Sequence, residues 1–440
     1  MYRIFKLTAI ALTVATVATP SVASDARALA LGGSAIANGH GAHGAFENPA
    51  SMMAMKRAGQ TVHFRVGMSA EVRDTGSAID TLTDEANENL ISDIETEIDQ
   101  LSNTSISCDP IFGNADDVCV TGTQSLSDLS TRLLDILDLV DDESIDIQAN
   151  ADLGMAFTKG NLPVAVNIHI SGTGSGEPAI AESDRAYIQE FETLLDNDTL
   201  TLGEAQASTF LTVDAFGIPL GVEQPEDVLT SEAQGSALLR TQLGISFAST
   251  LSVGGVIVDA GITPKFSSLK AYSSALVVSD EFDDNQPEIA DRFEDSEVSE
   301  SSFTFDVGGS LALTNFPVRV AAVLRNVVPE SVKTTEDFEF ETTPQLIVGA
   351  LMHKGPLSIT ADMALNEAKV DNFETQKIAV GVEFATSIFA LRGGLSHDAA
   401  RSNDTTALSL GFGIGPLHIG GRLTGTESLE AGMQLSYSFD

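Results

Sequence analysis

Few residue groups in this chain have the types and spacing that chemistry requires. Gly39-His40-Gly41-Ala42-His43-Gly44 has the glycine spacing of a dinucleotide-binding loop, which works only between a strand and a helix. We expect neither around it, and Pro49 follows closely, so we interpret the match as accidental. His40 and His43 are also a poor metal pair, because they lack a frame of cysteine or carboxylate ligands.

The longest acidic run, 280–300, holds ten carboxylates and one base, Arg292. We expect a solvated loop there; divalent cations that bridge it to lipopolysaccharide are the alternative. The chain has no serine-hydrolase elbow, zinc-protease helix, P-loop or EF-hand pattern. The sequence therefore predicts no enzymatic activity, no cofactor and no metal site.

Cys108 and Cys119 are the two cysteines of the chain, and ten residues separate them. Their spacing is neither that of a CxxC redox site nor that of a known metal site. In an oxidising compartment, an even pair at this distance predicts one local disulfide.

The first residues have the pattern of a secretory signal. Arg3 and Lys6 precede a mostly apolar stretch, 7–18, and small residues around Ala23 suit signal peptidase. We therefore assign 1–23 as a signal peptide and expect the mature chain in the envelope of a Gram-negative bacterium. The apolar stretch is shorter than the ~18 residues that a spanning helix needs.

The net charge of −40 excludes nucleic acid as a partner, because phosphate contacts need clustered lysine and arginine. Hydrophobic residues nevertheless make up 43% of the chain. No later run is apolar over the ~18 residues of a spanning helix. If the mature chain crosses a membrane, we expect a closed β-barrel, the other form that satisfies every backbone polar group.

From residue 145 onward, apolar residues recur with a period of two. Two runs illustrate it, with the apolar set named first: Ile378, Val380, Val382 and Phe384 against Lys377, Ala379, Gly381 and Glu383, and Leu357, Ile359, Ala361, Met363 and Leu365 against Ser358, Thr360, Asp362 and Ala364. Such alternation is typical of transmembrane barrel strands of roughly ten residues. A soluble antiparallel sheet over a core is the alternative.

The connections between these runs alternate between short and long, as they do in outer-membrane barrels. The short ones are 159–161, 315–317, 353–356, 385–387 and 415–416, and the long ones are 74–144, 174–234, 280–298, 328–341 and 398–404. We therefore predict an all-β transmembrane antiparallel barrel with an even strand number. Fourteen strands follow if 174–234 is one external loop and 253–279 one long strand. Sixteen follow if 207–217 is a strand and 253–279 breaks into two.

Two other segments are distinctive. Between a first strand, 60–73, and the next, the stretch 75–144 has apolar residues three or four apart, which predicts a helical hairpin with the cysteines at its turn. At the other end, Leu435, Tyr437 and Phe439 alternate with polar residues. We interpret this strand as the signal that the barrel assembly machinery reads. The chain has no tryptophan, so phenylalanine would have to form the aromatic girdles of the barrel.

Ala26 to Ala35, with Arg27 and the pair Gly32-Gly33, and the box Asn48-Pro49-Ala50 resemble the start of FadL-like outer-membrane proteins. The resemblance implies a hatch, 24–59, that plugs a fourteen-stranded barrel, 60–440, in a family that moves hydrophobic compounds. The residues agree with this. Asn48 can cap a short helix over 49–55, the glycines permit close packing in a lumen, and Arg27 can pair with a lumen carboxylate.

The remaining chain is similar to the family known as conjugal transfer protein TraF, through ordered short pieces: 261–265, 305–309, 325–329, 359–365 and 391–395. We expect an outer-membrane barrel that passes or binds small hydrophobic molecules, with membrane lipid and lipopolysaccharide as its surroundings. One alternative is a conjugal-transfer or envelope-assembly factor that acts through its external loops. The other is a soluble periplasmic β-protein.

Overall fold

The computed structural model describes residues 25–39, 41–74, 107–108, 118–120, 144–158, 162–186, 189, 199–201, 211–213, 219–222, 230–277, 289–313, 316–371, 373–400, 406–425 and 428–439. The expected signal peptide, 1–23, lies outside this set. So does the expected helical hairpin, 75–144, apart from Ser144 and two short strands that contain the cysteines. Both therefore stay predictions.

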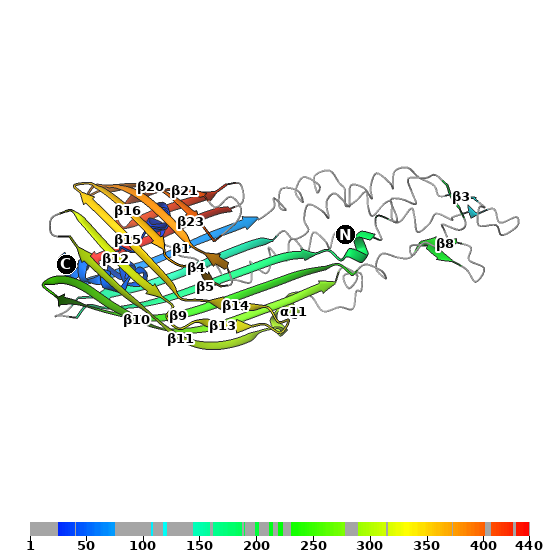
Figure 1. Cartoon of the computed structure of the whole chain (residues 1–440), viewed down its shortest axis with the longest axis horizontal. Helices are drawn as coiled ribbons and strands as arrows, with labels where there is room; N and C mark the ends of the chain where they lie inside the picture. The colour runs from blue at the N-terminus through cyan, green and yellow to red at the C-terminus, as the bar shows by residue number, and fades with distance from the viewer. Residues whose placement is uncertain are drawn as a thin grey trace.

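Fourteen antiparallel strands form one closed barrel in the order β1-β23-β22-β21-β20-β19-β16-β15-β12-β11-β10-β9-β5-β4 (Figure 1). The wall closes because β1 pairs on both sides: Val62 lies opposite Phe439 of β23 and opposite Phe157 of β4. The strand bounds are β1 Val62–Asp74, β4 Ile145–Phe157, β5 Val164–Ala179, β9 Glu232–Val253, β10 Val256–Val277, β11 Val298–Ala312, β12 Val318–Arg325, β15 Gln345–Lys354, β16 Leu357–Ala364, β19 Lys377–Ala385, β20 Phe389–Asp398, β21 Thr406–Ile414, β22 Leu417–Thr424 and β23 Ser428–Phe439.

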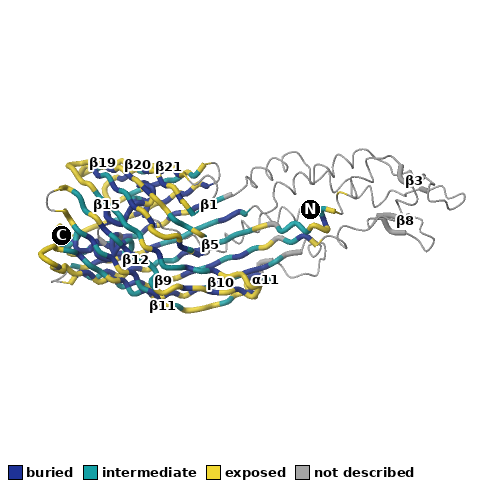
Figure 2. The backbone as a smooth tube through the Cα atoms, in the orientation of Figure 1, coloured by how far each residue is buried: buried dark blue, intermediate teal, exposed yellow. Residues whose placement is uncertain are grey.

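The alternation in the sequence determines which side chains face outward. In β19, Ile378 and Val380 are 43% and 46% exposed, whereas Ala379 and Glu383 are buried in the interior. Exposed and buried positions lie close together along the strands of the wall (Figure 2). The exposed large side chains of these strands are apolar, and many of the buried ones are polar or charged, so the outer face is apolar and the interior is polar. A soluble sheet would bury its apolar face instead. The prediction of a transmembrane-type barrel is confirmed, and the soluble alternative is wrong.

The fourteen-strand prediction is confirmed and the sixteen-strand alternative is wrong. Within 253–279 there is one long strand, β10 Val256–Val277, and not two. Among the described residues, Leu211–Val213 pairs with Pro219–Val222 in a separate small hairpin, β7–β8, outside the barrel wall. The expected loop 174–234 is shorter than we predicted, because β5 continues to Ala179 and β9 begins at Glu232. With 22 residues each, β9 and β10 have about twice the ~9–11 residues that span a bilayer, and they extend beyond their neighbours (Figure 1).

Because the chain has no tryptophan, phenylalanine forms most of the aromatic belt on the outer face of the barrel. Exposed rings gather within a few residues of the short-turn end of the strands: Phe157, Phe247, Phe384, Phe389, Phe412, Tyr437 and Phe439. Nearer the long-loop end, Phe266 and Phe303 lie opposite each other with ring centroids 5.1 Å apart. Amphipathic or aromatic side chains in such belts mark the two interfaces of a bilayer.

Residues 25–39 and 41–57 lie inside the barrel and form the plug, drawn in blue in Figure 1. Its elements are α2 Ala26–Ala30, α3 Gly41–Glu47, the 3₁₀ turn η1 Pro49–Ser51 and α4 Met52–Arg57. Methionines 52, 53 and 55 pack with alanines of α3, β4, β5 and β9, whose small size leaves room for them. None of the described helices has the length and apolar character needed to cross a bilayer.

Two local expectations differ from the structure. We expected no helix after Gly39, but α3 begins at Gly41, because packing in the lumen outweighs the low helix propensity of glycine. The short helix expected over 49–55 starts as η1 and continues as α4 to Arg57.

Smaller elements lie at the long-loop end. The expected loop 328–341 contains β13 Glu330–Lys333, which pairs with β14 Glu339–Thr342, and the connection after β16 contains β17 Ala368–Val370 and β18 Phe373–Thr375. Helix α11, Ile289–Asp295, lies within the expected loop 280–298.

The cysteine pair lies in a small three-stranded sheet. Its strands are β2 Ser107–Cys108, β3 Val118–Val120 and β6 Thr199–Thr201, and Cys108 lies directly opposite Cys119 in the β2–β3 register. The disulfide itself stays a prediction.

Candidate functional site

Arg27 of the plug binds the inner wall through a shared carboxylate. It follows Asp25, whose side chain caps α2 by accepting a hydrogen bond from the Arg27 backbone N–H at 2.8 Å. The Arg27 guanidinium donates from Nε and Nη2 to both oxygens of Glu383 at 2.8 Å each. Arg392 donates from its Nε to the same carboxylate at 2.6 Å. The predicted lumen partner of Arg27 is therefore Glu383, which lies on the polar face of the β19 pattern.

The glycine pair of the plug has two different roles. Gly32, at φ +75, is pressed against β20, since an added Cβ would lie 2.7 Å from the Leu395 carbonyl oxygen. On the wall, an added Cβ at Gly394 would lie 2.3 Å from the Gly32 nitrogen. Gly33 does not share this close packing, because a Cβ added there would meet no atom within 4 Å; its φ of +94 is what favours glycine there.

The Asn48-Pro49-Ala50 box docks on β10 and β11. Asn48 is fully buried, and its Oδ1 accepts from the Ala50 N–H at 3.1 Å, which caps η1 as the sequence predicted. Its Nδ2 lies within 3.3–3.4 Å of three carbonyl oxygens, of which two belong to wall strands. Gly261 and Gly308 provide the space for this box. A Cβ added at Gly261 would lie 2.6 Å from Pro49, and a Cβ added at Gly308 would lie 2.0 Å from Asn48.

Further polar anchors hold the rest of the plug, and sequence reasoning did not identify them. Asp362 accepts from the backbone N–H groups of Ala35 and Ile36 at 2.6 and 2.9 Å. The hydroxyls of Ser34 and Thr360 lie 2.8 Å apart. Both wall residues lie on the polar face of the Leu357–Leu365 run. That face was the available signal, although it could not indicate which plug residue each would contact.

Ion pairs complete the contact between plug and wall. Arg57 at the end of α4 pairs with Asp259 of β10 at 2.9 and 2.6 Å, and Glu47 pairs with Arg325 of β12. The plug is thus fixed by separate polar contacts on many strands rather than by strand pairing with the wall.

The long-loop mouth of the barrel is narrowed from inside. Val332 and Phe340 of the β13–β14 hairpin pack on the inward side chains Leu238 and Leu269 of β9 and β10. Arg240 of β9 pairs with Asp371, next to β17, at 2.6 Å and donates to the Thr342 hydroxyl at 2.7 Å. One arginine therefore holds two loops over the lumen.

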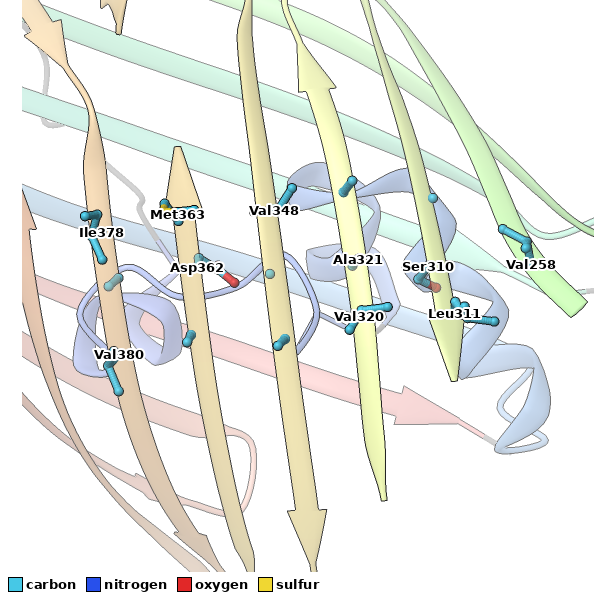
Figure 3. Close-up of a pocket in the computed structure, with 16 residues that line it drawn as sticks. Val258, Ser310, Leu311, Val320, Ala321, Val348, Asp362, Met363, Ile378 and Val380 are labelled. Carbon is cyan, nitrogen blue, oxygen red and sulfur yellow. The ribbon is translucent and has the colours of Figure 1, made fainter. Parts of the chain in front are cut away.

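An apolar hollow of about 760 Å³ lies in the wall between β10 and β19 (Figure 3). It opens on the outer face, where Val320, Met363 and Val380 are exposed. The alanines of neighbouring strands, such as Ala322, Ala350 and Ala361, make it deep. Figure 3 shows the plug passing behind these strands beside Asp362. The hollow and the plug are thus separated by a single layer of sheet.

A closed fourteen-stranded barrel with an apolar outer face and a polar-anchored plug defines a plugged barrel of the outer-membrane type. Residues 45–363 match the family model described as the F plasmid transfer operon TraF protein. The chain belongs to that family. The predicted membership is confirmed.

Solved structures with similar architecture include two toluene transporters. TbuX of Ralstonia pickettii is similar over 94% of this chain and 98% of its own, with 14% identity and a TM-score of 0.48. TodX of Pseudomonas putida is similar over 95% of this chain and 98% of its own, with 10% identity and a TM-score of 0.45. No curated protein matches the sequence.

Proposed function

We propose that this protein is an outer-membrane barrel that admits or holds small hydrophobic molecules, with the plug as its stopper. The observation that carries the proposal is the way in which the plug is held. Buried ion pairs and hydrogen bonds at separate points, such as Arg27 with Glu383, can be broken one at a time, whereas a strand paired into the wall could not leave it. The apolar hollow beside the plug offers a surface for an apolar molecule.

The remaining support comes from the sequence. The predicted export signal over 1–23 and the alternation of short turns with long connections favour the outer membrane of a Gram-negative bacterium, with the short turns toward the periplasm. Membrane lipid, lipopolysaccharide and the barrel assembly machinery are then the expected partners.

Locking the plug to the wall tests the proposal. Ser34 and Thr360 have hydroxyls 2.8 Å apart, so Ser34→Cys with Thr360→Cys, in a chain whose Cys108 and Cys119 are replaced by serine, places two thiols across the contact. Uptake of the fluorescent apolar probe N-phenyl-1-naphthylamine is then measured in cells whose outer membrane carries this variant. We expect uptake to fall to that of cells without the protein under oxidising conditions, and to return on reduction.

The single variant Ser34→Cys, treated in the same way, is the control and should take up the probe under both conditions. Equal uptake by the oxidised and the reduced double variant, with the disulfide verified by mass spectrometry, would contradict a role for the plug as stopper.

A second candidate function follows from the family: a conjugal-transfer or envelope-assembly factor that acts through its external loops. Deletion of residues 78–142 should then abolish mating while the barrel still assembles. Mating at the normal frequency without this segment would exclude that function.

A further inference from the structure

A second cavity lies at the short-turn end of the lumen, and the proposed passage does not require it. Its volume is about 230 Å³, and residues of β1, β19, β20, β21, β22 and β23 line it together with Arg27 of the plug. The short turn 386–388 forms its lip. It is smaller than the ~300 Å³ at which sites for drug-sized ligands begin, so it suits a small molecule.

Three residues of this lining have polar atoms without a hydrogen-bond partner. Among the described residues, Nη1 of Arg392, Nδ1 of His418 and Oε1 of Gln434 have none. Arg392 and Gln434 are only 6% and 4% exposed. A buried guanidinium N–H without an acceptor is costly, and native proteins rarely retain one. The cavity is therefore short of an acceptor group.

Two of these atoms lie beside the same space. A Cβ added at Gly413 would lie 2.5 Å from Nδ1 of His418 and 3.1 Å from Nη1 of Arg392. A side chain at this position would occupy the space between the two nitrogens, and glycine leaves it open. An oxygen atom bound there could accept from both.

Charge and shape narrow the choice of ligand. Arg27 and Arg392 share the single carboxylate of Glu383. The buried Asp25 carboxylate also acts on Arg27, Arg392 and His418, so two positive and two negative groups balance at the cavity. A dianion would be repelled strongly by Glu383 and Asp25, whereas a monoanion is repelled less and gains the unused N–H of Arg392. The planar guanidinium favours a carboxylate, and the lip residue Ile388, 71% exposed, offers an apolar surface to the rest of the ligand.

We propose that this cavity binds a small organic monocarboxylate, with its oxygens on Nη1 of Arg392 and the imidazole of His418 and its apolar body beside Ile388. The amide of Gln434 can rotate to offer its N–H group to the second oxygen. The site is independent of the plug's role as a stopper, since the ligand occupies the short-turn face without any movement of the plug.

Calorimetric titration of the full chain in an uncharged detergent tests the site, with benzoate as the probe. We expect one benzoate per chain. Gly413→Ala should weaken binding about tenfold or more, because it displaces the oxygen from a charge-assisted hydrogen bond. Gly393→Ala is the matched control, since its added Cβ meets nothing closer than 3.8 Å, and it should bind benzoate normally. His418→Leu provides a second variant if Gly413→Ala assembles poorly.

Titrations with dodecanoate and with inorganic phosphate show whether the natural ligand is a longer acid, a free small acid or an unspecific anion. If dodecanoate competes with benzoate and binds more tightly, the natural ligand is the head group of a longer acid; if benzoate binds as well or better, it is a free small acid. Either result supports the site. The proposal is overturned if benzoate does not bind, if inorganic phosphate binds equally well, or if Gly413→Ala and His418→Leu both bind like the unmodified chain.

Discussion

At the scale of single residues, Glu383 is the wall carboxylate that binds the plug through Arg27. It receives two guanidiniums, Arg27 from the plug and Arg392 from the wall, and is itself 5% exposed. A buried carboxylate with two positive partners is far more costly to remove than an exposed one, because its partners are left buried and uncompensated. One buried carboxylate therefore pairs with a guanidinium of the plug and with a guanidinium of the wall.

Glu383→Gln should loosen the plug. The loss of a buried partner costs about 3–5 kcal/mol, which exceeds what a single neutral hydrogen bond can replace. We expect the variant to show larger and more frequent openings in planar-bilayer conductance than the unmodified chain. Asp337→Asn removes the exposed pair with Lys333, whose side chains are 57% and 86% exposed, and should leave conductance unchanged. Identical traces for Glu383→Gln and Asp337→Asn would contradict the role assigned to Glu383.

Asp184 forms a contact before β9 that we predict to be sensitive to acid. Its carboxylate accepts from the N–H groups of Thr230 and Ser231 at 2.8 and 2.6 Å, just before β9. Burial alone would raise the pKa of Asp184, but the hydrogen bonds from Ser231 and Thr230 hold it below its ordinary value. A depressed carboxyl pKa stabilises the folded form above the unfolded pKa, about 4, and this stabilisation is lost as the pH falls through the folded pKa.

Hydrogen exchange measures this directly. After correction for intrinsic rates, protection of the Thr230 and Ser231 amides should be constant from pH 7 to about 4.5 and fall below about 4. Asp184→Asn should reduce protection about tenfold already at pH 7, as expected for the loss of a charge-assisted acceptor. Protection that is insensitive to both pH and the substitution would show that Asp184 does not hold this connection.

At the scale of elements, two neighbouring glycines of β20, Gly393 and Gly394, allow the cost of lost packing space to be compared with the effect of alanine on strand propensity. Gly393 faces ordinary contacts at 3.8 Å or more, whereas Gly394 touches the plug backbone at Gly32. Gly394→Ala should lower the stability of the assembled barrel by about 1–3 kcal/mol, the usual cost of overpacking. Gly393→Ala should be near neutral. The measurement is the denaturant midpoint of each variant, and equal midpoints would argue against close docking of the plug on β20.

The wall was largely predictable from the sequence, since alternation with a period of two reports which face of a strand is apolar. It placed Glu383 and Asp362 on the polar face of their strands, and Arg27 was predicted to pair with a carboxylate in the lumen, although not with Glu383 in particular. The pairing of Asp362 with Ala35 and Ile36 was not predictable, because strand patterns contain no information on how a plug lies across the strands. The mouth contacts of Arg240 were missed for the same reason.

Helix α3 and the β13–β14 hairpin show where local patterns fail. Glycine-rich stretches have weak helix propensity, so only the surrounding wall specifies the helix at Gly41. The hairpin strands are four residues each, too short for alternation to stand out, and their stability depends on Leu238 and Leu269 of distant strands.

At the scale of the whole molecule, we predict that assembly into a membrane depends on the outward face of the last strand. Phe439 is 53% exposed beside Tyr437, with ring centroids 4.7 Å apart. Phe439→Asn should reduce the fraction of protein that migrates faster when unheated on a detergent gel and that sediments with outer membranes. Ser438→Asn changes the neighbouring inward position and should assemble normally. Normal assembly of Phe439→Asn would refute the predicted role of Leu435, Tyr437 and Phe439.

The closure of the wall has a consequence for the order in which the molecule is built. The seam joins β1 to β23, and contacts across it, such as Glu71 with Ser428, link residues 357 positions apart. Contacts so distant in sequence carry the largest loop-closure entropy and form last. Helix α2 contacts β1 on one side of the seam and β22 and β23 on the other. Helix α2 thus spans the seam from inside, and because it precedes the wall strands in the chain, we infer that it can hold β1 and β23 together while the last pairing forms.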